Sequence, residues 1–507
     1  MAYLELRHIT KKFGSLVAND DISFFVEKGE IHALLGENGA GKSTLMNVLY
    51  GMYAQSSGEI WLDGKMLEIQ SPRDAIEHGI GMVHQHFMLV QPLTVIENVV
   101  LGMDEAVKLK IDLKGAAERF EALASKYGMD ISPWKTVSEL TIGDQQRLEI
   151  LKALYRESTL LILDEPTAVL TPQETAKLFE LLHELTKDGL TIIFITHKLA
   201  EVMNICDRCS VLRQGRMIKT LDVGDIDNFQ QLAELMVGHE VDLVTHKSEA
   251  KAGEEVLRTE GLCYTDAHNV VRLDNISLSV HRGEIVGIAG VDGNGQSELV
   301  KSITGLIKPT AGRVFINGTD VTFKTTKEIL RYKVSHIPED RHKMAMVKQM
   351  TINENLILMN YDQYPQCSHG LLNWKTITKN NKEICKKYDV KTPDVNEIAD
   401  KLSGGNQQKF VVGRELDREP DLLVAVYPDR GLDIAATKYI QSRLVEERDR
   451  GAAVLLVSTE LDEIMELSDR IIVLYKGKVI GEMPQKLAQR NKIGLLMAGV
   501  SLDEEAE

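Results

Sequence analysis

The sequence predicts an α/β fold that is built twice along the chain. Two long segments repeat each other, and apolar strand-like runs alternate with helical patterns inside each repeat. Strands that alternate with helices favour a mainly parallel sheet with helices on its faces. The length of 507 residues exceeds what one core usually organises, so we expect at least two domains.

The repeat is clearest around a glycine-rich segment. The stretch VEKGEIHALLGENGAGKSTL is echoed in the second half by VHRGEIVGIAGVDGNGQSEL. ELTIGDQQR is likewise echoed by KLSGGNQQK, and FITHKLAEVM by LVSTELDEIM, in the same order. Self-similarity that keeps its order and spacing indicates a duplicated domain. We expect a first domain at 1–238, a polar linker at 239–255, a second domain at 256–500 and an acidic tail at 501–507.

Each repeat predicts its elements in a similar order. A β-rich start leads to an apolar strand, at Ile31–Leu35 and again at Ile285–Ala289, and then to a glycine loop and a helix. A helical part follows in the first repeat, where Ala116, Phe120 and Leu123 recur at helical spacing. Two further apolar strands, LLILD and TIIFIT, come after it with a helical segment between them.

Composition excludes several classes of protein. A net charge of -16 argues against binding to a nucleic-acid backbone. The first residues, MAYLELRHIT, do not form a signal peptide, and no apolar run approaches the roughly 18 residues of a membrane span. We therefore expect the chain to stay in the cytoplasm. Five cysteines, an odd and low number, predict no disulfide partner, and we expect Cys206 and Cys209 to be packing residues.

The glycine loop of the first repeat carries a phosphate-binding pattern. GENGAGKST follows a predicted strand and begins a predicted helix, as the Walker A motif requires. Glycines let backbone N–H groups approach phosphates, and the helix N-terminus favours their negative charge. Lys42 should bridge the terminal phosphates of ATP, and Ser43 should hold Mg²⁺. The candidate binding residues of this loop are Gly36, Glu37, Asn38, Gly39, Ala40, Gly41, Lys42, Ser43 and Thr44.

The strand LLILDEPT supplies the acidic half of such a site. Asp164 ends the strand, where a carboxylate reaches the metal at the carboxyl edge of a sheet. Glu165 follows, placed to take a proton from the attacking water. Gln85 and His197 stand in loops, after a glycine-rich segment and a buried strand respectively, and each alone would more often be a surface or packing residue.

Taken together, these motifs resemble a known family. Walker A, Gln85, the L-S-G-G signature, Glu165 and His197 occur in the order of the ATP-binding subunit of an ABC transporter within the duplicated plan, in which the signature is that of the second copy, at 402–405. The tandem arrangement is similar, over almost the whole chain, to the fused ATPases of sugar and nucleoside importers. VHQHFMLVQPLTVIENVVLG resembles the nucleoside-uptake branch most. The resemblance therefore implies two tandem P-loop NTPase domains, each with a β-rich N-terminal part and a helical subdomain.

The resemblance also implies roles for individual residues. Each ATP would lie between the Walker motifs of one domain and the signature of the other. Gln85 would contact Mg²⁺ and report to the membrane partner, while His197 would hold the γ-phosphate. Phe13 would stack on adenine, although an aromatic residue there could equally belong to the core. The signature residues that would bind the γ-phosphate of ATP on the first domain are Ser403, Gly404 and Gly405.

The second repeat lacks the chemical groups of the first. Gln296 replaces the lysine, Val426 and Tyr427 replace the two acids, and Thr459 replaces the histidine. The first signature, LTIGDQQR, also departs from the family pattern, and head-to-tail pairing would place it opposite the weakened motifs. We therefore expect one hydrolytic site and one degenerate site. The glycines and Ser297 remain, so the degenerate site could still bind nucleotide.

Other positions have weaker signals. Glu339 aligns with Gln85, and Asp429 and Asp433 lie close to the replaced acids. We expect Asp429 to be a solvated loop acid rather than a metal ligand. The segment 87–90, Phe-Met-Leu-Val, either lines a groove for a permease helix or belongs to the core.

The function implied is an ATPase that energises an importer of nucleosides or simple sugars. Its partners would be two integral-membrane permease subunits and, through them, an extracytoplasmic substrate-binding lipoprotein, with no nucleic acid. The chain would sit on the cytoplasmic face of the cell membrane. The alternative is a soluble tandem ATPase acting on ribosomes. That class usually keeps both sites intact and has a long charged linker, so this sequence favours the importer.

Overall fold

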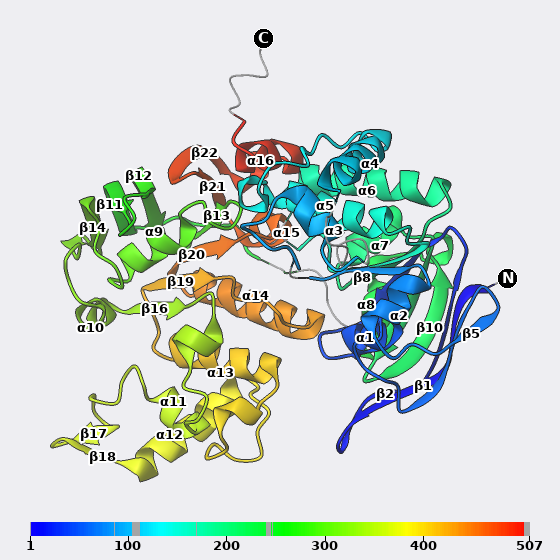
Figure 1. Ribbon diagram of the computed structural model, residues 1–507. Coiled ribbons are helices and arrows are strands. Elements are labelled where there is room, and N and C mark those ends of the chain that lie inside the picture. The colour runs from blue at the N-terminus through cyan, green and yellow to red at the C-terminus, as the bar shows by residue number, and fades with distance from the viewer. Residues whose placement is uncertain are drawn as a thin grey trace. The chain divides into compact units, whose positions relative to one another are not determined.

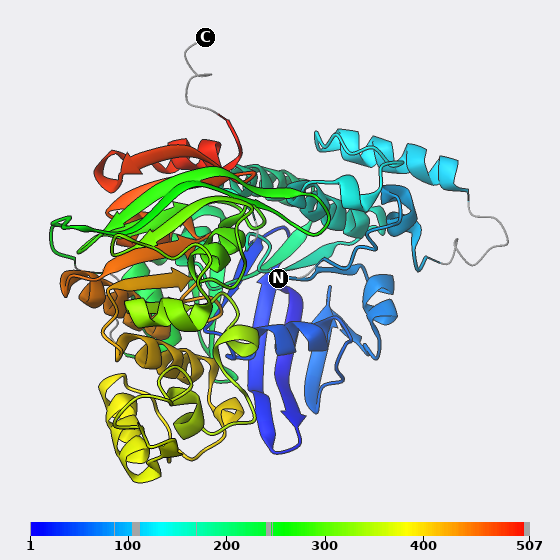
Figure 2. The same ribbon diagram turned by 90° about the vertical axis from the view of Figure 1, so that its left-hand side faces the viewer.

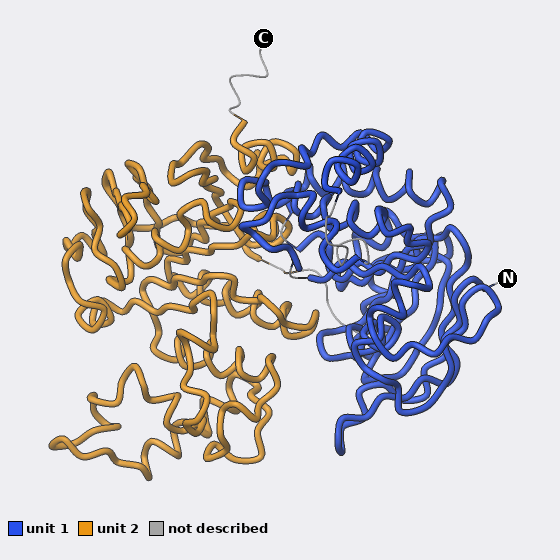
Figure 3. The backbone as a smooth tube through the Cα atoms, in the orientation of Figure 1, with its two compact units in different colours: residues 1–241 blue, residues 242–507 orange. Residues whose placement is uncertain are grey.

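The computed structural model describes residues 2–85, 87–103, 112–168, 170–239, 245 and 247–500. Contacts divide the chain into two compact units, residues 1–241 and 242–507 (Figure 3). The predicted acidic tail at 501–507 lies outside the described residues.

The first unit contains an antiparallel and a mainly parallel sheet. The antiparallel sheet has the order β2-β1-β4-β5, and Figure 2 shows β1 and β2 side by side. The larger sheet has the order β10-β9-β3-β8-β7-β6, with only β10 antiparallel to its neighbour. The strands are β1 Ala2–Phe13, β2 Leu16–Glu27, β3 Ile31–Leu35, β4 Ser57–Leu62, β5 Lys65–Leu67, β6 Ile80–Val83, β7 Leu160–Asp164, β8 Thr191–Thr196, β9 Arg208–Arg213 and β10 Arg216–Asp222.

Most helices of the first unit begin at a residue whose side chain caps them. Thr94 and Glu97 form a capping box at the start of α3, and Thr171 and Glu174 form another at the start of α6. Each box satisfies backbone N–H groups that a helix start leaves without partners. The helices are α1 Lys42–Leu49, α2 Pro72–Glu77, α3 Val95–Val100, α4 Leu113–Lys126, α5 Ile142–Tyr155, α6 Pro172–Lys187, α7 Leu199–Ile205 and α8 Phe229–Val237.

The second unit has the same plan. Its antiparallel sheet has the order β12-β11-β14-β15, and its larger sheet has the order β16-β19-β20-β13-β21-β22. A small hairpin of β17 and β18 is added beside the helical part (Figure 1). The strands are β11 Glu255–Thr265, β12 Val271–His281, β13 Ile285–Ala289, β14 Ala311–Ile316, β15 Thr319–Asp320, β16 Val334–Ile337, β17 Cys367–Ser368, β18 Leu371–Leu372, β19 Leu422–Val426, β20 Ala453–Ser458, β21 Arg470–Tyr475 and β22 Lys478–Pro484.

The helices of the second unit match those of the first in order. Thr351 and Glu354 form a capping box at α11, as Thr94 and Glu97 do at α3. The helices are α9 Gln296–Ile303, α10 Thr326–Ile329, α11 Ile352–Leu356, α12 Trp374–Lys387, α13 Gly404–Leu416, α14 Ile434–Asp449, α15 Leu461–Leu467 and α16 Arg490–Met497.

The larger sheets are buried on both faces. Ile285 and Ala289 of β13 belong to one hydrophobic cluster of the second unit, whereas Val286 and Ile288 belong to another. Because side chains alternate along a strand, these clusters lie on opposite faces of the sheet. This two-sided burial explains why the central strands are continuous apolar runs rather than alternating patterns.

Part of the predicted linker packs against the second unit. The backbone N–H of Thr245 donates to Glu466 Oε1 at 3.0 Å, and Lys247 Nζ lies 3.1 Å from Asp469 Oδ1. Arg448 Nη1 donates to the carbonyl of Ser248 at 2.8 Å. The polar composition of this segment therefore provides hydrogen bonds to one unit.

Candidate active site

The glycine loop of the first unit lies between β3 and α1. Gly41 has a φ of 102°, in the left-handed region that favours glycine. A Cβ on Gly41 would lie 2.6 Å from the carbonyl oxygen of Ala18, and one on Gly36 would lie 2.4 Å from that of Leu212. Both glycines are therefore required by close backbone packing.

Lys42 is the buried cation of this loop. The residue is 6% exposed, and its Nζ donates to the carbonyls of Gly36 at 2.6 Å and Glu37 at 3.1 Å. Burial lowers the pKa of the Lys42 amine, while the charges of Glu165 and Asp164 raise it. The loop thus holds its ammonium group within reach of its own backbone and near two acids.

The two acids follow one another at the end of β7. Asp164 is the last residue of the strand, and burial together with the charge of Glu165 raises the pKa of its carboxyl, against the opposing effects of Lys42 and Ser43. Glu165 has a φ of 47° and donates its backbone N–H to the carbonyl of Ile195 at 3.0 Å. A non-glycine residue keeps such a backbone only where its surroundings hold it.

Both carboxylate oxygens of Glu165 have hydrogen-bond partners. Gln85 Nε2 donates to Oε2 at 2.9 Å, and His197 Nδ1 lies 2.9 Å from Oε1. Burial alone would raise the pKa of Glu165, but the hydrogen bond and charge of His197, with Lys42, hold it below its ordinary value. The carboxylate form, which can accept a proton from water, is therefore the stable form near neutral pH.

Strand order explains this convergence. Gln85, Glu165 and His197 follow β6, β7 and β8, which are neighbours in one parallel sheet. The carboxyl ends of parallel strands meet at one edge, where α/β proteins place their ligands. The structure thus brings together three candidate residues that lie far apart in the sequence.

A buried network beside Glu165 was missed by sequence reasoning. Thr167 Oγ1 is hydrogen-bonded to the carboxylate of Glu201, and Thr196 Oγ1 donates to Glu201 Oε2 at 2.7 Å. Glu201, on α7, is only 7% exposed. The network ties the turn after Glu165 to the end of β8, and thus to the residue before His197. A glutamate in an ordinary helical pattern gave no signal of this role.

Phe13 lies at the end of β1. The residue is 41% exposed, and its ring meets that of Tyr53 edge-on, with ring centroids 5.3 Å apart. Lys11 Nζ lies 4.8 Å from the centroid of the Phe13 ring. The residue is therefore a partly exposed aromatic rather than part of the hydrophobic core.

The segment 87–90 is fixed by its backbone. The N–H of Met88 donates to Glu149 Oε1 at 2.7 Å, and that of Val90 donates to Asn98 Oδ1 at 2.7 Å. Leu89 is buried, whereas Met88 is 60% exposed and Val90 is 40% exposed. Met88 and Val90 can therefore contact a partner, and Leu89 belongs to the interior.

The loop of the second unit keeps the backbone and changes the chemistry. Gly295 has the same φ of 102° as Gly41. Gln296 is 2% exposed, and its Nε2 donates to the carbonyl of Val291 at 3.0 Å. Val291 occupies the position of Glu37, so the amide replaces one of the hydrogen bonds that the lysine makes in the first unit. The positive charge is lost.

The polar groups of the second loop are paired with one another. Tyr427, in the position of Glu165, has a φ of 45°, and its hydroxyl donates to Asp292 Oδ1 at 2.8 Å. Burial raises the pKa of that phenol, so it stays protonated. Ser297 Oγ donates to Glu339 Oε2 at 2.7 Å. Tyrosine thus fills the place of the base without being able to act as one.

The expectation that Asp429 is solvated is wrong. The residue is half-buried, accepts from Gln441 Nε2 at 3.3 Å and meets the buried carboxyl of Glu463. Burial, with the charge of Glu460, raises the pKa of Asp429 to about 6. Burial and the charge of Asp429 raise the pKa of Glu463 well above its ordinary range. This turn packs on α15, which the sequence does not indicate.

The two signature segments differ at the residue that precedes the motif's helix. Thr141 caps α5 by accepting from the N–H of Asp144 at 3.1 Å, and its hydroxyl donates to Asp144 Oδ2 at 2.8 Å. Ser403 stands before α13 without capping it, is exposed, and accepts from Asn406 Nδ2 at 3.0 Å. The hydroxyl hydrogen of Ser403 is therefore available to a ligand, whereas that of Thr141 is already donated.

The two closely spaced cysteines are buried in the first unit. Cys206 and Cys209 are buried, and burial raises the pKa of both thiols. Within the described residues, no group of three or more His, Cys, Asp or Glu side chains has metal-binding geometry. The cysteines pack in the interior.

Comparisons with known proteins decide the family. A family model described as ABC transporter matches residues 19–168 and again 273–425. The chain belongs to the ABC transporter family. It is 49% identical to a guanosine import ATP-binding protein of Bacillus subtilis, over 99% of this chain and 98% of that one. It is 45% identical to a nucleoside import ATP-binding protein of Lactococcus lactis, over 99% of both chains. A glucose import ATP-binding protein of Haloferax volcanii is 44% identical over 98% of this chain and 96% of that one.

These matches confirm the tandem ABC ATPase fold, which the repeat together with the family resemblance of the motifs predicted. They also confirm the prediction that the chain is an ATP-binding subunit of an import system, a class of ATPases coupled to transport. The ribosome-acting alternative receives no support from these relatives, all of which are named as import proteins.

Proposed function

We propose that this ABC protein hydrolyses ATP to drive the import of nucleosides, with one hydrolytic site per chain. The observation that supports a hydrolytic site is that Gln85 and His197 hydrogen-bond to the two carboxylate oxygens of Glu165, next to the loop that buries Lys42. The nucleoside substrate is supported by relatives named for nucleoside and guanosine import at 45% and 49% identity. The relative named for glucose import keeps simple sugars as the second candidate.

The first unit's loop would bind the phosphates of ATP. Backbone N–H groups of residues 36–44 would donate to the phosphate oxygens, with the start of α1 favouring their charge. The Lys42 ammonium would leave its carbonyl partners for the terminal phosphates. Phe13, exposed on the end of β1, would stack on the base.

Glu165 would then act as the general base. Its carboxylate would take the proton of the attacking water, while Gln85 and His197 hold its two oxygens in place. During turnover His197 would also reach the γ-phosphate. The turn that carries Glu165 is kept rigid by the Thr167–Glu201 pair.

The residues around the loop fit Mg²⁺. Ser43, Gln85 and Asp164 present hydroxyl, amide and carboxylate oxygens, which are the donors that this hard cation prefers. When bound, Mg²⁺ would neutralise part of the negative charge of the phosphates.

The signature of the second unit would complete the hydrolytic site. This proposal rests on the sequence pattern of the family and on the exposed hydroxyl of Ser403. Ser403, Gly404 and Gly405 would donate to the γ-phosphate. The degenerate site of the second unit would lack both the cation and the base. Gln296 and Tyr427 stand in their places, and each is hydrogen-bonded inside its own unit.

The partners we propose are two permease subunits and a substrate-binding lipoprotein that reaches the chain through them. Met88 and Val90 would form part of the permease contact. The chain would be peripheral to the cytoplasmic face of the cell membrane. No helix among the described residues has both the length and the apolar composition needed to cross a bilayer.

The test is gentle detergent extraction of the tagged chain from its own cells, followed by mass spectrometry of the proteins that co-purify. Permease subunits with a lipoprotein are expected. Calorimetric titration of that lipoprotein with guanosine, ribose and glucose would then distinguish the two substrate classes. Recovery of ribosomal proteins in place of permeases would overturn the transport function.

A further inference from the structure

The helical part of the second unit displays apolar side chains on a short hairpin. Tyr364 is 86% exposed, Leu371 is 76% exposed and Trp374 is 45% exposed. They lie on or beside the β17–β18 hairpin and at the first residue of α12, at an edge of the unit (Figure 1). Single exposed apolar residues are common on soluble proteins, but a cluster of them indicates a contact surface.

A row of lysines continues from this hairpin along α12. Lys375, Lys379, Lys382 and Lys386 recur at intervals of three or four residues and are all exposed. With 3.6 residues per turn, this spacing places them along one face of the helix. None of the four forms an ion pair with another residue in the parts of the chain that the structure describes. All four ammonium groups are therefore exposed to solvent, and of them Lys382 interacts electrostatically with Asp394.

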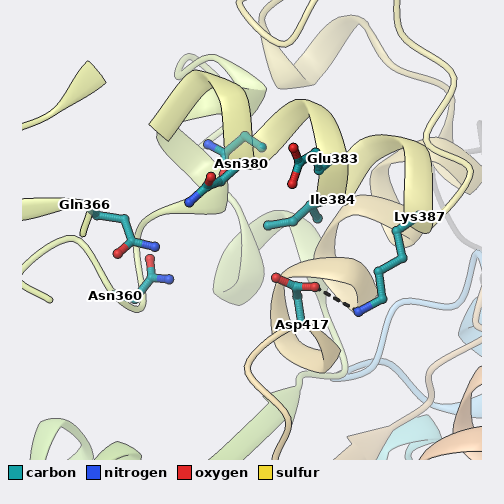
Figure 4. Close-up of a pocket in the computed structure, with 8 residues that line it drawn as sticks. Asn360, Gln366, Asn380, Glu383, Ile384, Lys387 and Asp417 are labelled. Carbon is teal, nitrogen blue, oxygen red and sulfur yellow. Dashed lines mark hydrogen bonds and ion pairs between the residues drawn. The ribbon is translucent and has the colours of Figure 1, made fainter. Parts of the chain in front are cut away.

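Lys387 of the same helix provides a contrast. Its Nζ donates to Asp417 Oδ1 at 3.0 Å, and it lines a polar pocket of about 420 Å³ together with Asn360 and Gln366 (Figure 4). None of the four exposed lysines lines that pocket. The lysine row is thus a surface separate from the pocket.

The corresponding helix of the first unit lacks this charge. Helices α4 and α12 have the same length and both follow a capped short helix. In α4, three basic residues are balanced by two acids, whereas α12 has five lysines and one acid. Since the whole chain carries -16, the positive face of α12 runs against the general charge of the protein.

We propose that the exposed face of α12 and the β17–β18 hairpin dock on an anionic lipid bilayer. Tyrosine, tryptophan and leucine side chains partition into the interfacial region of a bilayer, and lysine stems reach past them to the headgroups. Each lysine near an anionic surface strengthens binding by about fivefold. The exposed apolar side chains match the apolar interior of a bilayer, and the row of exposed lysines matches its negative headgroups. This goes beyond attachment through permeases, because the chain itself contacts lipid, and it does not depend on ATP hydrolysis.

The test is co-sedimentation of the full-length chain with large vesicles. One set of vesicles is phosphatidylcholine alone, and the other is an equal mixture of phosphatidylcholine and phosphatidylglycerol. The first variant replaces Lys375, Lys379, Lys382 and Lys386 with glutamine, and a second replaces Leu371 with serine. The matched control replaces four exposed lysines of the first unit, Lys12, Lys65, Lys114 and Lys177, with glutamine.

The expected result is binding to the anionic vesicles alone. The α12 variant should bind about 600-fold more weakly, Leu371→Ser should bind several-fold more weakly, and the control should bind like the parent. Added salt should release the parent chain, since screening weakens headgroup attraction. Equal binding by the α12 variant and the control, or no binding by the parent, would overturn the proposal. Unchanged vesicle binding with loss of permease co-purification would make the occupant a protein.

Discussion

The two units hold nearly the same loop backbone around opposite chemistry. Gly41 and Gly295 share a φ of 102°, and Glu165 and Tyr427 have φ values of 47° and 45°. Side chains at the same positions form a cation with a carboxylate in the first unit, and a neutral amide with a phenol in the second. The shared backbone satisfies packing, and only the side chains decide whether the site can hydrolyse ATP.

The loop of the second unit replaces the lost chemical groups with side chains that have their own hydrogen-bond partners. Gln296 and Tyr427 each make a hydrogen bond to the loop, to Val291 and Asp292 respectively. A buried polar group without a partner costs about 1–3 kcal/mol, and these two substitutions avoid that cost. The glycines are therefore explained by the requirements of the fold, and the missing cation is replaced by internal hydrogen bonding.

Removing the base should have the largest effect on this asymmetry. Glu165→Gln should lower steady-state turnover by about 10²- to 10⁴-fold, because no other carboxylate is held at that position. ATP binding, measured by filter retention, should persist. Tyr427→Phe is the matched control and should keep most turnover. Substantial hydrolysis by Glu165→Gln would show that the second unit is active.

Substitutions of Lys42 and Gln296, which occupy the same position in the two loops, should also differ strongly in their effect on turnover. Lys42→Ala should lower turnover by about 10²- to 10³-fold, since a cation that stabilises phosphoryl transfer is removed. Gln296→Ala removes one buried hydrogen bond and should change turnover little, although it should reduce stability by about 1 kcal/mol. Comparable losses of turnover in the two variants would contradict the asymmetric account.

His197 should affect the pH profile of the hydrolytic site. Its hydrogen bond and charge help to hold the pKa of Glu165 below the ordinary value. In His197→Ala that pKa should rise, so the acidic limb of the kcat/KM profile should move to higher pH. Turnover at the optimum should fall by at least about tenfold. An unmoved acidic limb would mean that Glu165 is not the group that titrates.

The smallest expected effect concerns stability in the second unit. A carboxyl whose pKa is raised by folding contributes stability below its unfolded pKa, and this is lost as pH rises through the folded pKa. The pKa of Asp429 is raised to about 6, and that of Glu463 is raised well above its ordinary value by burial and by the charge of Asp429. The melting temperature of the second unit should therefore fall as pH rises from about 4 to above 6.

The substitution that tests this effect is Asp429→Thr, which restores the residue found at Thr167 in the first unit. In that unit a threonine hydroxyl meets Glu201 in place of a second carboxyl. Scanning calorimetry across the same pH range should then show a flatter dependence for the second unit. The control is Asp462→Asn, which replaces an exposed acid on α15, the helix that carries Glu463. This variant should keep the pH dependence of the parent.

The sequence predicted the fold better than the site. The strands Ile31–Leu35 and Ile285–Ala289 are found with the expected bounds, because apolar runs between glycine turns have few alternatives. The pairings Thr167–Glu201 and Asp429–Glu463 could not be read from the chain, since only the packing of α7 and α15 on their sheets brings those residues together. The role of each site residue stays a prediction for the experiments above.

The central claim is that each chain hydrolyses one ATP per turnover. The most direct test is to load the chain with radiolabelled ATP, allow a single turnover, quench it, and count the bound ADP and ATP per chain. No more than one ADP per chain is expected, with any second nucleotide recovered as intact ATP. Two ADP per chain would show that the second unit hydrolyses as well and would contradict the account.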